Sequence, residues 1–261
     1  MPNTEINKIA IIGTGNVAVN LSLALKDAGL DIIQVFGRNK IFAKELANKL
    51  NSSFTTDFKK ITTDADLIIL SILDSALSDV VNQINVENSL IVHTSGTTSI
   101  DVLKNASINY GVFYPLQTFI KQKRISFDNI PVCVEANNIE NLKRIKQLAE
   151  KISKDVREIN SDERKIIHLS AVIASNFSNY MYLVAEDVLK KHGIPFDILK
   201  PLIKETSEKI KERNPKQVQT GPAYRNDLGI IKEHLDMLSN FPDYKEVYKL
   251  ISENLLKLNI V

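Results

Sequence analysis

The sequence predicts an α/β fold in which a doubly wound parallel sheet is followed by an all-helical region. The chain begins with an apolar run at residues 9–12, a glycine turn and a helical pattern. Short apolar runs then alternate with helical patterns up to about residue 159, which is typical of βαβ units. Beyond residue 160 only helical periodicity continues. We therefore expect one domain at 1–160 and a second, all-α domain at 161–261.

Composition and charge exclude several classes of protein. The 261 residues are 44% hydrophobic and 25% charged, as in globular proteins, and the formal net charge of +2 gives no signal for nucleic acid or membrane surfaces. The one cysteine, Cys133, excludes an internal disulfide and a cysteine-built metal site. No apolar run approaches the roughly 18 residues of a membrane span, and residues 1–8 lack a signal core. We expect a cytoplasmic protein without metal, membrane or nucleic-acid partners.

The first strand-to-helix turn carries the clearest motif. The sequence Gly13-Thr14-Gly15-Asn16-Val17-Ala18 follows the first apolar run and has the G-x-G-x-x-A pattern. Gly13 permits a tight turn, Gly15 lets a diphosphate approach the backbone, and Ala18 lets the helix pack closely on the strand. Free N–H groups at the helix N-terminus favour the negative charge of the diphosphate. The motif predicts a Rossmann domain that binds a dinucleotide through residues 13–17; a simple glycine turn is the alternative.

The end of the second predicted strand, at residues 32–36, indicates which dinucleotide the chain binds. An NAD site has an acidic residue about 20 residues past the glycines, where it binds the ribose hydroxyls. This chain has Gly37-Arg38-Asn39 there. Arg38 can stack on adenine and pair with a 2′-phosphate, with Asn39 beside it, whereas a solvated arginine is the alternative. We expect NADP, and NAD is less favoured.

Polar residues follow the later strands of the predicted sheet. Strands are expected at 53–55, 66–72, 89–92, 111–114, 130–134 and 156–159, with helices at 40–50 and 139–152. Ligands of such sheets bind at the carboxyl ends of the strands. The polar residues at those ends are Ser71, His93, Thr94, Ser95, Tyr114 and Gln117. We predict that Ser71, His93 and Ser95 bind the cofactor, and that Asp74 or Ser75 caps the helix starting near Ala76.

The first long helical pattern, from about residue 163 to 191, carries a polar stripe. His168, Ser175, Asn176 and Asn179 fall at i, i+7, i+8 and i+11, so they share one face of an α-helix. The other residues are mostly apolar, which predicts a buried helix axis with Ser161 or Asp162 as its N-cap. Buried polar groups need partners. A polar cleft opposite the cofactor would supply them, and helix-to-helix hydrogen bonds are the alternative.

The loop before the predicted helix at 225–238 indicates an anion site. Helices are expected at 197–212, 225–238 and 244–258, so Arg225 falls in a first turn, where it opposes the helix dipole. A guanidinium beside free backbone N–H groups suits a carboxylate. We predict that Thr220, Gly221 and Arg225 bind a substrate carboxylate, whereas a capped interdomain loop is the alternative.

Several longer segments carry a family resemblance, among them IIGTGNVA, IVHTSGTTS, GVFYPLQTF, HLSAVIASNFSNYM and QTGPAYRND. They run nearly end to end, and through them the chain resembles a bacterial family that joins a Rossmann-like domain to a DUF2520-type helical domain. The wider superfamily that it looks like includes pyrroline-5-carboxylate reductases, prephenate dehydrogenases and 6-phosphogluconate-type dehydrogenases. The resemblance implies an all-α domain of the 6-phosphogluconate dehydrogenase-like type that contributes substrate contacts. It also implies a homodimer through that domain.

Two departures from the superfamily leave the proton donor open. Many members have His before the Pro of the strand-end motif, where this chain has Tyr114-Pro115. The Lys-x-x-x-Asn pair of the hydroxyacid dehydrogenases is absent from the long helix, in which His168 and Asn176 stand eight residues apart.

We therefore predict an NADP(H)-dependent oxidoreductase of a small carboxylate-bearing ketone, imine or alcohol, with the hydride carried by the cofactor. His168 is the first choice of proton donor or acceptor, because imidazoles exchange protons near neutral pH. Tyr114 and His93 are alternatives, and Asn176 and Asn179 would orient the reacting atom. Two non-catalytic hypotheses remain, a dinucleotide-binding sensor or regulatory protein and a dimerisation module on an empty Rossmann scaffold.

Overall fold

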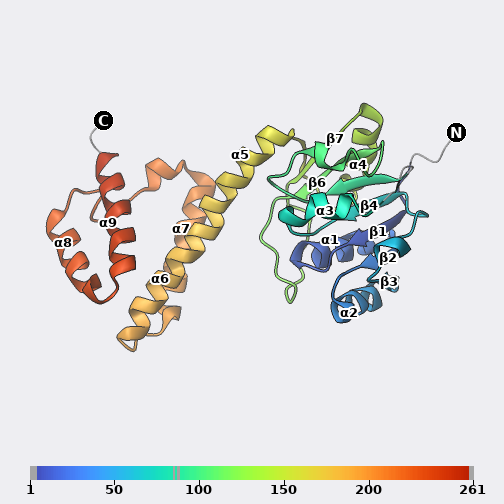
Figure 1. The fold of residues 1–261 in the computed structure, drawn as a ribbon. Coiled ribbons are helices and arrows are strands. Elements are labelled where there is room, and N and C mark those ends of the chain that lie inside the picture. The colour runs from blue at the N-terminus through green and yellow to red at the C-terminus, as the bar shows by residue number, and fades with distance from the viewer. Residues whose placement is uncertain (1–4, 85, 87–88, 259–261) are drawn as a thin grey trace. The chain divides into compact units, whose positions relative to one another are not determined.

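The computed structural model describes residues 5–84, 86 and 89–258 (Figure 1). The chain divides into two compact units, Met1–Asn176 and Phe177–Val261. The predicted domain boundary near residue 160 lies just after the last strand, which ends at Glu158. The units divide later, within a helical stretch.

The first unit is built on a single sheet with strand order β3-β2-β1-β4-β5-β6-β7-β8. The strands are β1 (Lys8–Ile12), β2 (Asp31–Phe36), β3 (Ser53–Thr55), β4 (Leu67–Leu70), β5 (Leu90–His93), β6 (Tyr110–Pro115), β7 (Val132–Ala136) and β8 (Val156–Glu158). All neighbouring strands are parallel except β6 and β7. A parallel pair needs a crossover, usually a helix, and the connection 116–131 contains none, so β7 returns antiparallel to β6. The predicted doubly wound sheet is otherwise confirmed.

Helices cover both faces of the sheet. Ile9 and Ile11 of β1 belong to a core cluster shared with α1 (Asn16–Asp27), α2 (Lys40–Leu50) and α4 (Ile139–Glu150). Ala10 and Ile12, which point the other way, belong to the cluster that contains α3 (Leu77–Val81). Burial on both faces explains why β4 reads Leu-Ile-Ile-Leu, with every side chain buried.

A helical stretch follows the sheet. It consists of α5 (Ser161–Ala171), a π-helical turn (Val172–Phe177) and α6 (Ser178–Lys191), and the two compact units divide within the π-helical turn. The second unit continues with α7 (Lys200–Glu212), α8 (Leu228–Met237) and α9 (Pro242–Lys257). Short 3₁₀ turns lie at 58–60, 74–76, 100–103, 196–199, 215–218 and 238–240. No helix in the described ranges is long and apolar enough to cross a membrane.

The N-cap of α5 is Asn160, so the prediction of Ser161 or Asp162 was wrong. The Asn160 side chain accepts the backbone N–H groups of Asp162 and Glu163 at 3.0 and 2.9 Å. The Glu163 carboxylate accepts the Asn160 N–H in return, which completes a capping box.

The other two predicted helix starts also need correction. No side chain caps the 3₁₀ turn Asp74–Ala76 or α3; the Asp74 carboxylate instead accepts the Thr97 hydroxyl at 2.5 Å. The helix α8 begins at Leu228 and is capped by Asp227. Arg225 therefore precedes the helix, and the dipole argument does not apply to it.

The predicted buried axis was wrong for the single chain. Ile166, Leu169 and Ile173 are 66%, 60% and 53% exposed, because no element among the described residues covers these side chains. The buried residues of α5 and α6 are instead Arg164 and Val184.

Candidate functional site

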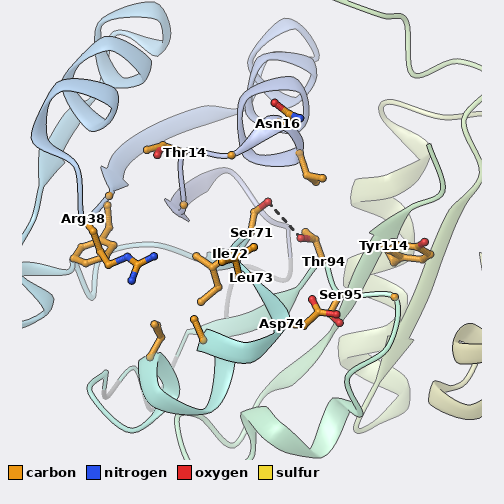
Figure 2. A pocket seen from close by; sticks show the side chains of 18 of the residues that line it. Thr14, Asn16, Arg38, Ser71, Ile72, Leu73, Asp74, Thr94, Ser95 and Tyr114 are labelled. Carbon is orange, nitrogen blue, oxygen red and sulfur yellow. Dashed lines mark hydrogen bonds between the residues drawn. The ribbon is translucent and has the colours of Figure 1, made fainter. Parts of the chain in front are cut away.

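A cavity of about 800 Å³ lies in the first unit, at the carboxyl ends of the central strands (Figure 2). In these sheets ligands bind where the strand order reverses, here between β1 and β4. Figure 2 shows Arg38 on one side of the view and Tyr114 on the other, with Ser71, Ile72 and Thr94 between them. The predicted site residues that line the cavity are Gly13, Thr14, Gly15, Asn16, Val17, Arg38, Asn39, Ser71, Ser95, Tyr114 and His168.

The two glycines of the turn have different roles. Gly13 has a φ of +129°, and a Cβ there would collide with the backbone carbonyl of Ser71. A Cβ at Gly15 would meet no heavy atom within 4 Å. Gly13 is therefore required by the fold, whereas Gly15 keeps space open beside the cavity. No side chain caps α1, so its first N–H groups remain available to an anion.

The residues after β2 also differ in role. Asn39 caps α2, since its side-chain oxygen accepts the N–H groups of Ile41 and Phe42 at 2.9 and 3.3 Å. Arg38 lines the cavity and forms no ion pair within the described residues. The stacked rings of Phe36 and Phe58, with centroids 4.3 Å apart, line the same part of the cavity. Among the residues that the structure describes, Arg38 is thus a cation without an ion-pair partner, and it lies beside an aromatic surface.

Tyr114 and His168 form a hydrogen-bonded pair on the cavity wall. The Tyr114 hydroxyl lies 3.1 Å from Nδ1 of His168, and both residues line the cavity. Burial raises the pKa of Tyr114 to about 12. The phenol is therefore protonated at neutral pH, and the pair combines a proton donor with an imidazole.

His93 was predicted to contact the cofactor, but its side chain is not part of the cavity lining. Its side chain is fully buried and does not line the cavity, because β5 lies between β4 and β6 and the ring points into the protein. Nδ1 accepts the N–H of Ser95 at 3.2 Å. Burial, followed by the nearby charge of Arg164, lowers the pKa of His93 to about 4. A neutral, enclosed imidazole does not exchange protons with a substrate.

One further predicted residue of the first unit, Asn176, is not part of the cavity lining. Its side chain is exposed. The π-helical turn changes the α-helical spacing between His168 and Asn176, whereas Ser175 reaches the Thr118 hydroxyl at 3.0 Å. Asn179, Thr220, Gly221 and Arg225 lie in the second unit, and their role stays a prediction. In the part of the chain that the structure describes, no three His, Cys, Asp or Glu residues form a metal-binding group.

Sequence reasoning missed Arg164 and Glu135. The Arg164 side chain is fully buried next to the cavity wall and pairs with the Glu135 carboxylate. A signal was available, because an arginine close to a helix N-terminus opposes the helix dipole. In the sequence SDERK it looks like part of an ordinary charged helix start.

Two family models match the chain. The one described as NADP oxidoreductase, coenzyme F420-dependent, matches residues 8–96, and the one described as a domain of unknown function, DUF2520, matches residues 130–255. The crystal structure of a candidate NADP oxidoreductase from Bacteroides fragilis is 40% identical in sequence, with a TM-score of 0.93. That match covers 98% of this chain and 100% of the other. The chain belongs to the DUF2520 family of NADP-oxidoreductase-like proteins. The predicted family is confirmed.

More distant structures share the fold of this DUF2520-family chain. An imine reductase from Myxococcus stipitatus in complex with NADP⁺ is 14% identical, with a TM-score of 0.66, and the match covers 96% of this chain and 92% of the other. A 1-pyrroline-5-carboxylate reductase from Streptococcus pyogenes is 16% identical, with a TM-score of 0.59, covering 98% and 100%. No curated protein sequence matches the chain.

The buried His93 should make folding stability depend on pH. Between pH 6.5 and about 4 the unfolded chain binds a proton at this residue and the folded chain does not, so stability falls as the pH falls. The loss reaches about 3 kcal/mol at pH 4. His93→Asn, which keeps an acceptor for the Ser95 N–H, should remove this contribution. Urea unfolding from pH 7 to pH 4 measures it, with exposed His192→Asn as the control. Equal pH dependence in wild type and His93→Asn would contradict the assignment.

Proposed function

We propose that this chain is an NADP(H)-dependent oxidoreductase of a small carboxylate-bearing ketone, imine or alcohol. The observation that carries the proposal is the Tyr114–His168 pair on the wall of the cavity that also contains the glycine turn. Kinship with a candidate NADP oxidoreductase at 40% identity supports it, as does the shared fold of an imine reductase with bound NADP⁺.

The residues present fit a dinucleotide phosphate. The open space at Gly15 and the uncapped start of α1 would accept the diphosphate on backbone N–H groups. Arg38, which has no ion-pair partner within the described ranges, would hold the 2′-phosphate. When bound, the cofactor supplies or accepts the hydride.

Tyr114 and His168 would handle the proton. When the imidazole carries its proton on Nδ1, it donates to the Tyr114 oxygen and leaves the phenol proton free for the substrate oxygen or nitrogen. As that proton leaves, the Nδ1 proton replaces it on the phenol while Nε2 takes up a proton from solvent, so neither a phenolate nor an imidazolate accumulates. In the oxidative direction the same protons return. Thr220, Gly221 and Arg225 remain our proposed carboxylate contacts, on the strength of the family resemblance, and Asn179 our proposed contact to the reacting atom.

We also propose a homodimer formed through the predicted helical domain. Ile166, Leu169 and Ile173 recur at helical spacing and are all more than half exposed, so they form an apolar stripe that the described part of the chain leaves uncovered. A second copy of the chain is the occupant that the resemblance implies.

The dimer can be tested at Leu169. Leu169→Glu should give a monomer in sedimentation velocity, because an unpaired carboxylate buried in an apolar interface is strongly unfavourable. Ile139→Glu, on α4 and 87% exposed, is the matched control and should leave the dimer intact. A dimer that survives Leu169→Glu would contradict this interface.

Cofactor choice can be tested at Arg38. Arg38→Ala should weaken NADPH binding by about 10- to 100-fold, the value of one lost charged hydrogen bond, and leave NADH binding nearly unchanged. Nucleotide fluorescence measures both affinities. Lys49→Ala, at the other end of α2, is the control. Wild-type binding that is tighter for NADH than for NADPH would reject the assignment of Arg38.

The chemical step can be tested at Tyr114. Tyr114→Phe should lower kcat for NADPH oxidation by on the order of 10²- to 10⁴-fold, the usual contribution of a positioned proton donor, without changing the NADPH Kd. A panel of cyclic imines and 2-oxo acids provides the substrates. Tyr248→Phe is a matched control, because Tyr248 lies 2.8 Å from Nδ1 of His234 in the second unit. Saturable NADPH binding without oxidation by any substrate would favour the sensor.

A further inference from the structure

The buried guanidinium of Arg164 joins two segments that are distant in sequence. Nη1 donates to the Glu135 carboxylate on β7 at 2.5 Å. On the other side, Nε donates to the Ser95 carbonyl at 3.1 Å and Nη2 to the Thr98 carbonyl at 2.6 Å. The Ser161 hydroxyl contacts both members of this ion pair: it donates to the Glu135 carboxylate at 2.8 Å and accepts from Nη2 of Arg164 at 3.2 Å. Arg164 thus ties β7 and the segment 95–98 to α5.

The segment 95–98 is a closed turn that forms part of the cavity wall. The Ser95 hydroxyl accepts the N–H groups of Thr97 and Thr98 at 3.1 and 2.9 Å. The carbonyls of Ser95 and Thr98 point outward to Arg164, and Ser95 and Gly96 line the cavity. The guanidinium therefore binds both ends of this segment of the wall.

Gly96 lies directly against the imidazole of His168. A Cβ at Gly96 would be 2.7 Å from Cγ of the ring and closer still to Nδ1. Nδ1 is also the atom that meets the Tyr114 hydroxyl. Arg164 and His168 are one helical turn apart on α5, so one turn carries both the anchor of the wall and the imidazole that the wall contacts.

We infer that Arg164 is a positioning residue: it holds Gly96 against His168 and so keeps Nδ1 aligned with the Tyr114 hydroxyl. The inference rests on the proposed function of that pair in proton transfer. A buried ion pair is weak evidence for stability by itself, which makes a role in fixing geometry the better explanation of this one. Arginine is required because its planar fork serves the carboxylate and two carbonyls together, whereas an ammonium cannot.

Arg164→Lys tests the inference, because it keeps the charge and removes the fork. In NMR spectra of the full chain, the ring resonances of His168 should move, while those of His192 and His234 in the second unit stay in place. His168→Gln identifies the resonance. For the panel substrates kcat should fall on the order of 10²-fold with the NADPH Kd unchanged, as expected for a misplaced catalytic group. Gly96→Ala should reproduce both effects by direct contact with the ring.

Controls separate positioning from general destabilisation. Arg157→Lys, in an exposed ion pair with Asp155, should move neither the His168 resonances nor kcat. If Arg164→Lys does not fold, Glu135→Gln carries the same test, because it removes the charge that orients the guanidinium and keeps the side-chain volume. A folded variant with unchanged His168 resonances and unchanged kcat overturns the inference. If none of the panel substrates supports NADPH oxidation by the wild type, the proposed function fails. The ring resonances of His168 still decide the positioning role.

Discussion

The close approach of Gly13 to the Ser71 carbonyl determines the local path of the chain at the site. With a φ of +129° and no side chain, Gly13 lets the end of β1 lie against the end of β4 while the chain turns into α1. The order of the sheet reverses at this point, so the ends of the flanking strands separate and leave a cavity. The backbone N–H groups of α1 and the side chains after β2, β4, β5 and β6 converge on that space. Other features of the site refine this arrangement.

Residues whose role follows from local geometry were predictable from the sequence. Strands β1 and β4 are buried on both faces, which leaves continuous apolar runs in the sequence. The glycine turn was recognisable because strand, turn and helix occur in the necessary order. Tyr114 and Ser71 could be assigned to the site because parallel strands end at one edge of the sheet, whatever the details of packing.

Residues whose role depends on distant partners were not predictable. His93 also ends a strand, but only the packed structure shows that its ring points inward. Asn176 fits the α-helical stripe with His168, but only the packed structure shows that it is exposed and does not line the cavity. An arginine near a helix N-terminus opposes the helix dipole and so indicates a role other than helix stability. We applied this argument to Arg225, which precedes its helix, whereas Arg164 is the arginine that lies near a helix N-terminus. The distant partners of Arg164 include Glu135, Ser95 and Thr98, and nothing in the local sequence pairs them with this arginine.

Gly96 has an ordinary backbone conformation, so the main chain itself does not demand a glycine there. Only the neighbouring imidazole excludes a side chain. A lineage that replaced the histidine by a smaller residue would be free to replace the glycine as well. The two positions should consequently change together during evolution, although more than seventy residues separate them along the chain.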